Sequence, residues 1–439
     1  MNAEHTIALW LLALAYTGII WWKAPKQVSA SGFFKGKHAD GKDPSLGLLI
    51  ASAAISWIFA KSIVNAADLS QAFGFWGGVG YGVYYLSFVV AGIAFYLIRT
   101  RTAYTSLPAF LRGKYGLVGM RLFLLAVGIR LYNEIWSNTK VVGSFFGPEG
   151  GSQYWLAVLV FTVFTVIYTW RGGLRSSLLT DAFQMVFAGL LLAITLFVIS
   201  PPLIREWPQA TPDMTGSALT FALLAFLQIF SYPFHDPVMT DRAFITSPRT
   251  MLKGFIAAGL LSGAFIVLFS LVGLYARLQG EGSGPAVLSV SAALGLPMLL
   301  IFNVMMLTSA GSTLDSTFSS AGKLSILDWK SRQAIAPNSV RRARGIIVAL
   351  AILGNLPLLT IYMGDQIGPA VIAATTISGT MVMGLAPIIL FSFLPTSALN
   401  FHLAFWPGLI LGGLLAFTPS LFPAWVAVGS GKYALATGV

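Results

Sequence analysis

The sequence predicts an all-α integral membrane protein, and three features point to that class. Hydrophobic residues make up 56% of the 439-residue chain, whereas charged residues make up 10%. The mean hydropathy of +0.79 exceeds what a soluble domain of this length needs to fill its core. Apolar runs of about 20 residues recur along nearly the whole chain, and each is long enough to cross roughly 30 Å of hydrocarbon as a helix.

We count about thirteen such runs, which are the expected transmembrane helices. They lie at residues 5–23, 46–66, 75–98, 120–147, 153–170, 178–200, 217–237, 252–277, 297–325, 342–362, 368–394, 402–420 and 422–439. The first run is not a cleavable signal, because Glu4 and His5 precede it and Lys23 follows it without a small-residue cleavage site. The last run reaches Val439 without a polar tail, which leaves open whether the natural chain continues.

The basic residues predict the orientation of the chain. Most of the 27 lysines and arginines fall in every second loop, as the positive-inside rule expects if the N-terminus lies outside. The formal net charge of +12 forms no stripe along one helix, so we expect no nucleic-acid partner. The expected location is the cell's inner (plasma) membrane, with the lipid bilayer as the surroundings of a multi-pass protein.

The composition also argues against several kinds of chemistry. The chain has no cysteine, and its four histidines are scattered along the sequence. A disulfide framework, a thiolate metal site and a cysteine nucleophile are therefore excluded, and we see no pairing of a nucleophile with a base. No polar stretch is long enough for a separate soluble domain, so we expect one membrane domain over residues 1–439 that is not an enzyme.

Two apolar segments are interrupted in ways that favour a broken helix. Prolines interrupt the seventh run at Ser231–Pro237, and Gly364–Pro369 stands at the head of the eleventh. An unwound helix exposes backbone groups that can bind ions and substrates, although proline kinks are also common in plain membrane helices. The two readings carry even weight.

Polar residues inside the runs are the candidate functional residues, because burying them in a bilayer is costly. The segment Thr308–Thr317 carries many small hydroxyls, which either allow close helix packing or supply oxygen ligands to a small cation. Arg130 and Glu134 are spaced i, i+4 and are expected to pair with each other. Asp181 starts the sixth run, where it is either a helix N-cap or part of an ion path.

Motifs in several runs together resemble the sodium:solute symporter family, which carries proline, pantothenate, sugars and urea. The motifs are Ser52–Trp57, Gly172-Gly173 followed by Thr180-Asp181 and Gln184, residues 236–242 ahead of an Ala-Phe pair, and residues 312–328. The resemblance covers roughly residues 5–420. It implies the leucine-transporter-type fold, a 5+5 inverted repeat: residues 46–200 and 217–394, an extra N-terminal helix at 5–23, and additional C-terminal helices at 402–439.

The resemblance also implies a sodium site between the first and eighth core helices. Carried over by motif, its ligands are the carbonyl oxygens of Ile55, Ile58 and Ser309 and the hydroxyls of Ser312 and Thr313. Five neutral oxygens can hold Na⁺ without a fixed carboxylate, which permits the reversible binding that a coupled carrier needs. For Asp181 and Asp315 we expect either an inner route for the released ion or helix capping and polar packing.

Lys61 is the least expected residue inside a run, one helical turn outward of Ile58. It either binds an anionic group of the substrate or supplies an ammonium that modulates or replaces the sodium ion. Some members of the family place an aspartate where this chain has Trp57. The candidate substrate-binding residues are Trp57, Lys61, Phe75, Trp76, Tyr232 and Asp236.

The expected function is Na⁺-coupled symport of a small polar or anionic organic solute by alternating access. One alternative is a membrane module that senses a solute and signals to a domain beyond Val439. Another is a channel or facilitator whose flux is indifferent to the sodium gradient.

Overall fold

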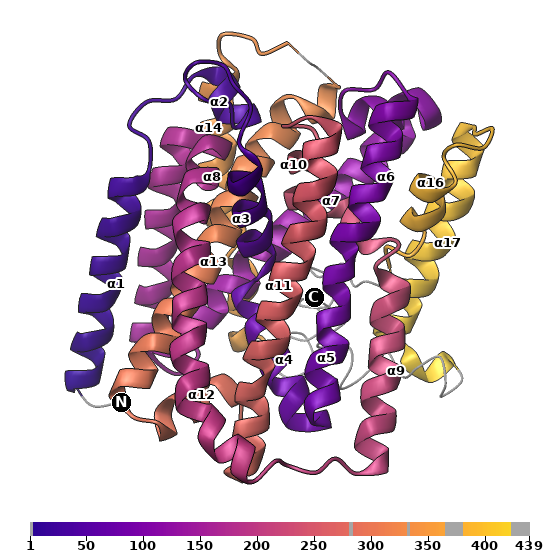
Figure 1. The fold of residues 1–439 in the computed structure, drawn as a ribbon. Coiled ribbons are helices and arrows are strands. Elements are labelled where there is room, and N and C mark those ends of the chain that lie inside the picture. The colour runs from indigo at the N-terminus through magenta and orange to yellow at the C-terminus, as the bar shows by residue number, and fades with distance from the viewer. Residues whose placement is uncertain (1–2, 281–283, 332–333, 365–380, 423–439) are drawn as a thin grey trace.

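The computed structural model describes residues 3–280, 284–331, 334–364 and 381–422, and within them every regular element is a helix. Most of the long helices stand side by side, roughly parallel or antiparallel (Figure 1). Eight helices of the described part are long and apolar enough to cross a membrane, or nine if one bent pair counts as a span. The prediction of an all-α membrane protein therefore holds for these residues.

The helices follow one another along the chain with short connections. They are α1 (Ala3–Lys23), α2 (Ala30–Lys35), α3 (Leu46–Trp57), α4 (Ala60–Phe73), α5 (Phe75–Gly82), η1 (Val83–Leu86), α6 (Ser87–Arg101), α7 (Leu107–Phe146), α8 (Ser152–Arg205), α9 (Pro212–Gln228), η2 (Tyr232–His235), α10 (Pro237–Arg242), α11 (Pro248–Leu278), α12 (Ala286–Ala293), α13 (Leu296–Ile326), η3 (Asp328–Lys330), α14 (Ser339–Leu353), η4 (Leu356–Tyr362), α16 (Leu385–Leu390), α17 (Ala398–Phe417) and η5 (Pro419–Leu421).

The second predicted span is broken in its middle. Helices α3 and α4 meet at Ile58 and Phe59 with a bend of 59°. Ile58 leaves the helical region with φ −79° and ψ 68°, although neither proline nor glycine stands there. The break is held from outside, because Ser309 Oγ of α13 donates to the Ile58 carbonyl and the Ala60 N–H donates to Asn138 Oδ1 at 3.0 Å.

Helix α8 contains two predicted spans that fold back on each other. Its 54 residues would extend about 81 Å as one rod, far more than a bilayer core. Gly173 interrupts it with φ +53° and ψ −140°, a conformation that favours glycine. Tyr168 and Thr180, on opposite sides of that glycine, both donate to Asp315 Oδ2, at 3.0 and 2.9 Å. The chain therefore reverses at Gly173, as the separate runs 153–170 and 178–200 predicted.

The predicted break at Ser231–Pro237 is present. A short 3₁₀ helix, η2, and the six-residue α10 replace a continuous span there. Asp236 caps α10, since its Oδ1 accepts from the Val238 N–H at 2.8 Å. Most of the second predicted break, from residue 365 onward, lies outside the described residues.

The count of thirteen spans is not confirmed. The run 422–439 lies outside the described residues apart from residue 422, and so does the first part of 368–394. The rest of that run holds only the six-residue α16, and the short helices α2 and α12 were not expected. The two inverted repeats remain a prediction.

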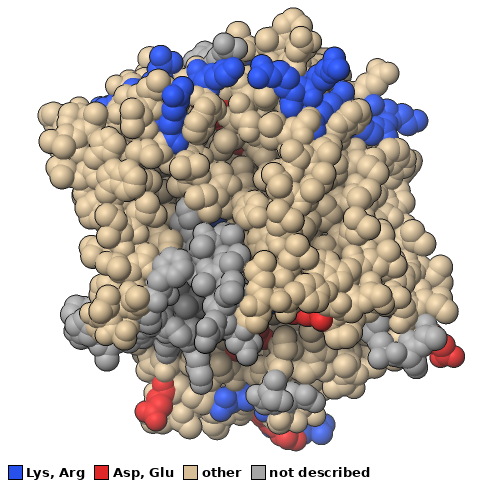
Figure 2. All heavy atoms as spheres, turned by 180° about the vertical axis from the view of Figure 1, so that it is seen from behind, with Lys and Arg blue, Asp and Glu red and all other residues tan. Residues whose placement is uncertain are grey.

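Burial and charge show how the bundle is arranged. Most of α13 is buried, whereas α1 and α17 are largely exposed, so α13 lies at the centre and the other two at the periphery. Lysine and arginine side chains line one end of the molecule, above a broad apolar belt (Figure 2). This is the distribution that the loop charges predicted, and α2 and the start of α14 lie at that end (Figure 1).

Candidate functional site

A buried polar network surrounds Arg242, the last residue of α10. Its guanidinium pairs with Asp181 of α8 at 3.2 Å and donates to Ser52, Ser56 and Ser316, at 2.8, 3.1 and 2.8 Å from Nη2. Arg242 and Asp181 are both 0% exposed. Sequence reasoning counted Arg242 among the basic residues of an inner loop, which is wrong, because the side chain turns into the bundle and binds four helices together.

The two aspartates proposed for the ion path lie in the same region. Asp181 Oδ2 accepts from Ser52 at 2.5 Å and from Ser177 at 3.1 Å. Asp315 accepts from Thr180 at 2.9 Å, one residue before Asp181. Asp181 is not a helix N-cap, since it lies well inside the second half of α8, so that alternative is wrong.

The predicted sodium ligands on the broken span face α13. The carbonyls of Ile55 and Ile58 end α3, and both residues are fully buried. The Ile55 carbonyl accepts from the Ile58 N–H at 3.1 Å, and the Ile58 carbonyl accepts from Ser309. The break therefore brings backbone oxygens of α3 against the hydroxyl-rich segment of α13.

The two predicted hydroxyl ligands on α13 are buried beside that break. Ser312 donates to Asp181 Oδ1 at 2.5 Å and lies 3.1 Å from Ser56 of α3. Thr313 donates to the Ser309 carbonyl at 3.0 Å. Each proton has a partner oxygen, so the lone pairs of Ser312 and Thr313 remain for another ligand.

Four buried charged side chains form a second cluster, which we call the charge quartet: Lys61, Arg130, Glu134 and Asp236. Glu134 Oε1 lies 2.9 Å from Lys61 Nζ and 2.5 Å from Arg130. Arg130 also lies 3.5 Å from Asp236. The predicted pairing of Arg130 with Glu134 is confirmed, and Lys61 joins it. Two cations and two anions give the quartet no net charge.

The quartet is anchored on α7. Lys61 Nζ also donates to Asn133 at 3.0 Å, and Asn138 Nδ2 donates to Glu134 Oε2 at 3.0 Å. Asn138 is the same residue that receives the Ala60 N–H at the start of α4. Sequence reasoning missed both asparagines, and the signal available was amides spaced near an intramembrane Glu134.

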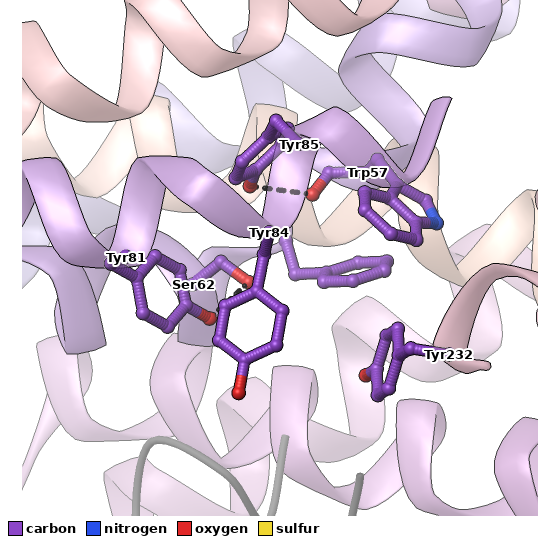
Figure 3. A pocket seen from close by; sticks show the side chains of 7 residues that line it. Trp57, Ser62, Tyr81, Tyr84, Tyr85 and Tyr232 are labelled. Atoms are coloured by element: carbon purple, nitrogen blue, oxygen red, sulfur yellow. Dashed lines mark hydrogen bonds between the residues drawn. The ribbon is translucent and has the colours of Figure 1, made fainter. Parts of the chain in front are cut away.

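A pocket lies beside the break between α3 and α4 (Figure 3). It encloses about 280 Å³ of empty space, which includes an opening to solvent, and is lined by Trp57, Phe59, Ser62, Tyr81, Tyr84, Tyr85 and Tyr232. We call it the aromatic pocket. Two of the predicted substrate residues line it, Trp57 and Tyr232.

The other aromatic candidates lie elsewhere. Phe75 and Trp76 are not among the residues that line the aromatic pocket, and Trp76 is 49% exposed. Phe75 packs against Trp76 and Trp207, with ring centroids 5.6 and 5.8 Å apart. The apolar pattern indicated aromatic residues near a helix start but not which way they face. Tyr81, Tyr84 and Tyr85 line the pocket instead, and sequence reasoning missed them.

A further pocket of about 400 Å³, partly open to solvent, lies between α7, α10 and α13. Its lining includes Asp241, Lys323 and Asp328, and Lys323 Nζ lies 2.5 Å from Asp241 and 3.8 Å from Asp328. Among the described residues, no group of three or more His, Cys, Asp or Glu could hold a metal ion.

No family model and no curated protein matches the sequence. Solved structures do match. A Na⁺-coupled sialic acid symporter in a substrate-bound outward-open state is 14% identical, covering 96% of this chain and 98% of its own at a TM-score of 0.55. Mhp1, a nucleobase-cation-symport-1 family transporter in a closed conformation with bromovinylhydantoin bound, is also 14% identical, covering 92% and 95% at 0.51.

At this level of identity the likeness shows the fold. The chain has the all-helical fold of these transporters, as the predicted leucine-transporter-type architecture expected. No sequence match places it in the sodium:solute symporter family specifically.

Proposed function

We propose that this chain is a secondary transporter that couples sodium to the symport of a small polar organic solute by alternating access. The observation that carries the proposal is the break at Ile58, which lies in a transporter fold and faces the hydroxyls of α13. Broken helices at the middle of a membrane are where such folds bind ions and substrates. Na⁺ coupling is the function that best explains a neutral oxygen site at that point.

The proposed sodium ligands are the carbonyl oxygens of Ile55, Ile58 and Ser309 and the hydroxyl oxygens of Ser312 and Thr313. They come from two helices, α3 and α13, so that a change in the angle between these helices would open the site. A hard cation prefers oxygen ligands, and here none of the five carries a charge. Binding that depends on one conformation is what couples an ion to a conformational change.

The positions of the two breaks support the proposed repeats. The first break falls near the start of residues 46–200 and the second near the start of residues 217–394, at corresponding places. We propose that the basic end of the molecule faces the cytoplasm of a cell whose plasma membrane holds the protein, with the N-terminus outside. Asp181 and Asp315 then lie on the inner side of the sodium ligands, as an ion route requires.

Sodium should stabilise the purified protein selectively. A ligand that binds only the folded state adds about 2.7 kcal/mol of stability at 100 times its Kd. We expect Na⁺ to raise the melting temperature in detergent above that in K⁺ or choline at equal ionic strength. The double variant Ser312→Ala/Thr313→Ala should lose this Na⁺-selective increment, because it lacks two of five ligands.

Ser319→Ala is the matched control, because Ser319 is a buried serine of the same helix that donates to the backbone of Ser316. It should retain the sodium increment. Equal melting temperatures of the wild-type protein in all three cations would contradict the proposal and favour a sodium-independent facilitator or a sensor. Retention of the increment in the double variant would move the ion away from Ser312 and Thr313.

A further inference from the structure

We infer that the aromatic pocket takes an uncharged, planar solute that carries N–H donors, of the amide or ureide class, and that Glu134 sets this preference. The inference rests on the proposed function, since it assumes that the pocket holds the transported solute. It replaces the expectation that Lys61 binds an anionic group of the substrate.

The lining of the aromatic pocket offers no counter-ion to a charged solute. Its seven residues are six aromatic side chains and Ser62. A carboxylate or an ammonium transferred into such a lining loses its hydration without gaining an opposite charge, which is costly. A neutral solute avoids this cost. The aromatic faces also provide surfaces on which a flat molecule can pack.

The hydroxyl protons of three lining tyrosines are already committed. Tyr81 donates to Ser62 Oγ at 2.9 Å, Tyr84 to Gln228 Oε1 at 2.8 Å, and Tyr85 to the Trp57 carbonyl at 2.9 Å. Each hydroxyl oxygen retains lone pairs but has no second proton to give. The solute must therefore bring donors. An amide or ureide does so, whereas a carboxylate has none.

The charge quartet lies against two rings of the pocket and is closed on itself. The Arg130 guanidinium is 4.9 Å from the Tyr232 ring centroid and 5.3 Å from that of Phe59. Lys61 Nζ is 5.4 Å from the Phe59 centroid. A cationic solute would meet rings that already face cations. An anionic solute would find Lys61 neutralised by Glu134 at 2.9 Å.

Glu134 thus occupies the place that a substrate carboxylate would take beside Lys61. Removing its charge leaves Lys61 and Arg130 opposed by Asp236 alone, a net positive charge next to the pocket. Buried charges that lose their partner are strongly unfavourable, so an external anion becomes a favoured ligand. Specificity of this kind comes from the unfavourable pairing that the wrong ligand meets.

The pocket also limits the size of the solute. Its 280 Å³ equals about nine waters at their liquid volume, part of which is the opening to solvent. This accommodates a ring with one amide group and excludes an oligosaccharide or a peptide.

The test compares two series of isosteric probes that differ in charge: benzamide, benzoate and benzamidinium, and the smaller acetamide, acetate and acetamidinium. Each is titrated against the full-length protein in sodium buffer, and the melting temperature is read. We expect at least one amide to protect at concentrations tenfold or more below those of its charged analogues. Equal protection by the carboxylate or the amidinium, or no protection by either amide, would overturn the inference. Failure of the proposed function is separate, since it removes the sodium increment itself.

The second arm uses Glu134→Gln, with Glu149→Gln as control because Glu149 pairs with Lys140 at 3.1 Å on the half-exposed surface. Glu134→Gln should bring the carboxylate of the protecting series to at least tenfold lower concentrations, while Glu149→Gln should match the wild type. An unchanged carboxylate in a folded Glu134→Gln protein would overturn the role of Glu134. If that variant does not fold, the wild-type series still decides the solute class.

Discussion

Replacing Arg242 with methionine is expected to lower the stability of the folded protein by about 3–5 kcal/mol. The guanidinium is fully buried and holds Asp181 at 3.2 Å while donating to serines on α3 and α13. Methionine fills much of the volume but leaves the aspartate buried without its cation. The measurement is the unfolding free energy in mixed detergent, or the melting temperature where unfolding is irreversible.

Two further variants separate the ion pair from simple packing. Adding Asp181→Asn to Arg242→Met should recover part of the loss, because the buried charge is then removed together with its partner. Arg249→Met is the matched control, since Arg249 is exposed at the start of α11, and it should change stability by about 0.5 kcal/mol or less. Additive effects of the two network variants would show that Arg242 and Asp181 do not interact.

Replacing Gly273 with alanine is the second large expected effect. A Cβ on Gly273 of α11 would overlap the Ala67 carbonyl oxygen of α4 and would lie 2.6 Å from the carbonyl carbon and 2.9 Å from the Gln71 nitrogen. These are backbone atoms, so no side chain can rotate away and the two helices must separate. We expect a loss of about 3 kcal/mol, the upper end of what overpacking costs.

Gly189→Ala provides the control of opposite sign. Gly189 lies in α8, and a Cβ there would meet no atom within 4 Å. Alanine is the better helix former, so stability should stay the same or rise by up to about 1 kcal/mol. Equal losses in the two variants would mean that α4 and α11 are not packed as closely as described.

Apolar length was sufficient to predict the uninterrupted helices. The runs 5–23, 252–277 and 297–325 became Ala3–Lys23, Pro248–Leu278 and Leu296–Ile326. A helix that crosses a bilayer must satisfy its backbone within itself and face lipid or other helices with apolar groups. Its ends are therefore written in the sequence as a change of polarity.

The interruptions were predictable only where the chain carries its own cause. Prolines marked the break before α10, and paired glycines marked the reversal in α8. Nothing local marks Ile58, because the partners that hold its neighbourhood open, Ser309 and Asn138, are distant in sequence. A break that depends on tertiary partners leaves no pattern of its own.

The candidate site divides in the same way. The residues proposed around the ion lie on two helices in contact, so the motif carried their proximity. The pocket was predicted in part, since Trp57 and Tyr232 line it and Phe75 and Trp76 do not. Periodicity says that a residue is on a helix, whereas the neighbour that it faces is set by how the helices pack. The burial of Arg242 was missed for this reason.

The turn at Ile58 joins two half-helices that are fastened to different parts of the molecule. Ser52 and Ser56 fix α3 to Asp181 and Arg242, whereas Ala60 and Lys61 fix α4 to α7. Any swing of one part against the other concentrates its rotation in this two-residue pivot. A sodium ion held by the Ile55 and Ile58 carbonyls and by α13 would act as a pin through the pivot, and its departure would release the α4–α7 arm to move.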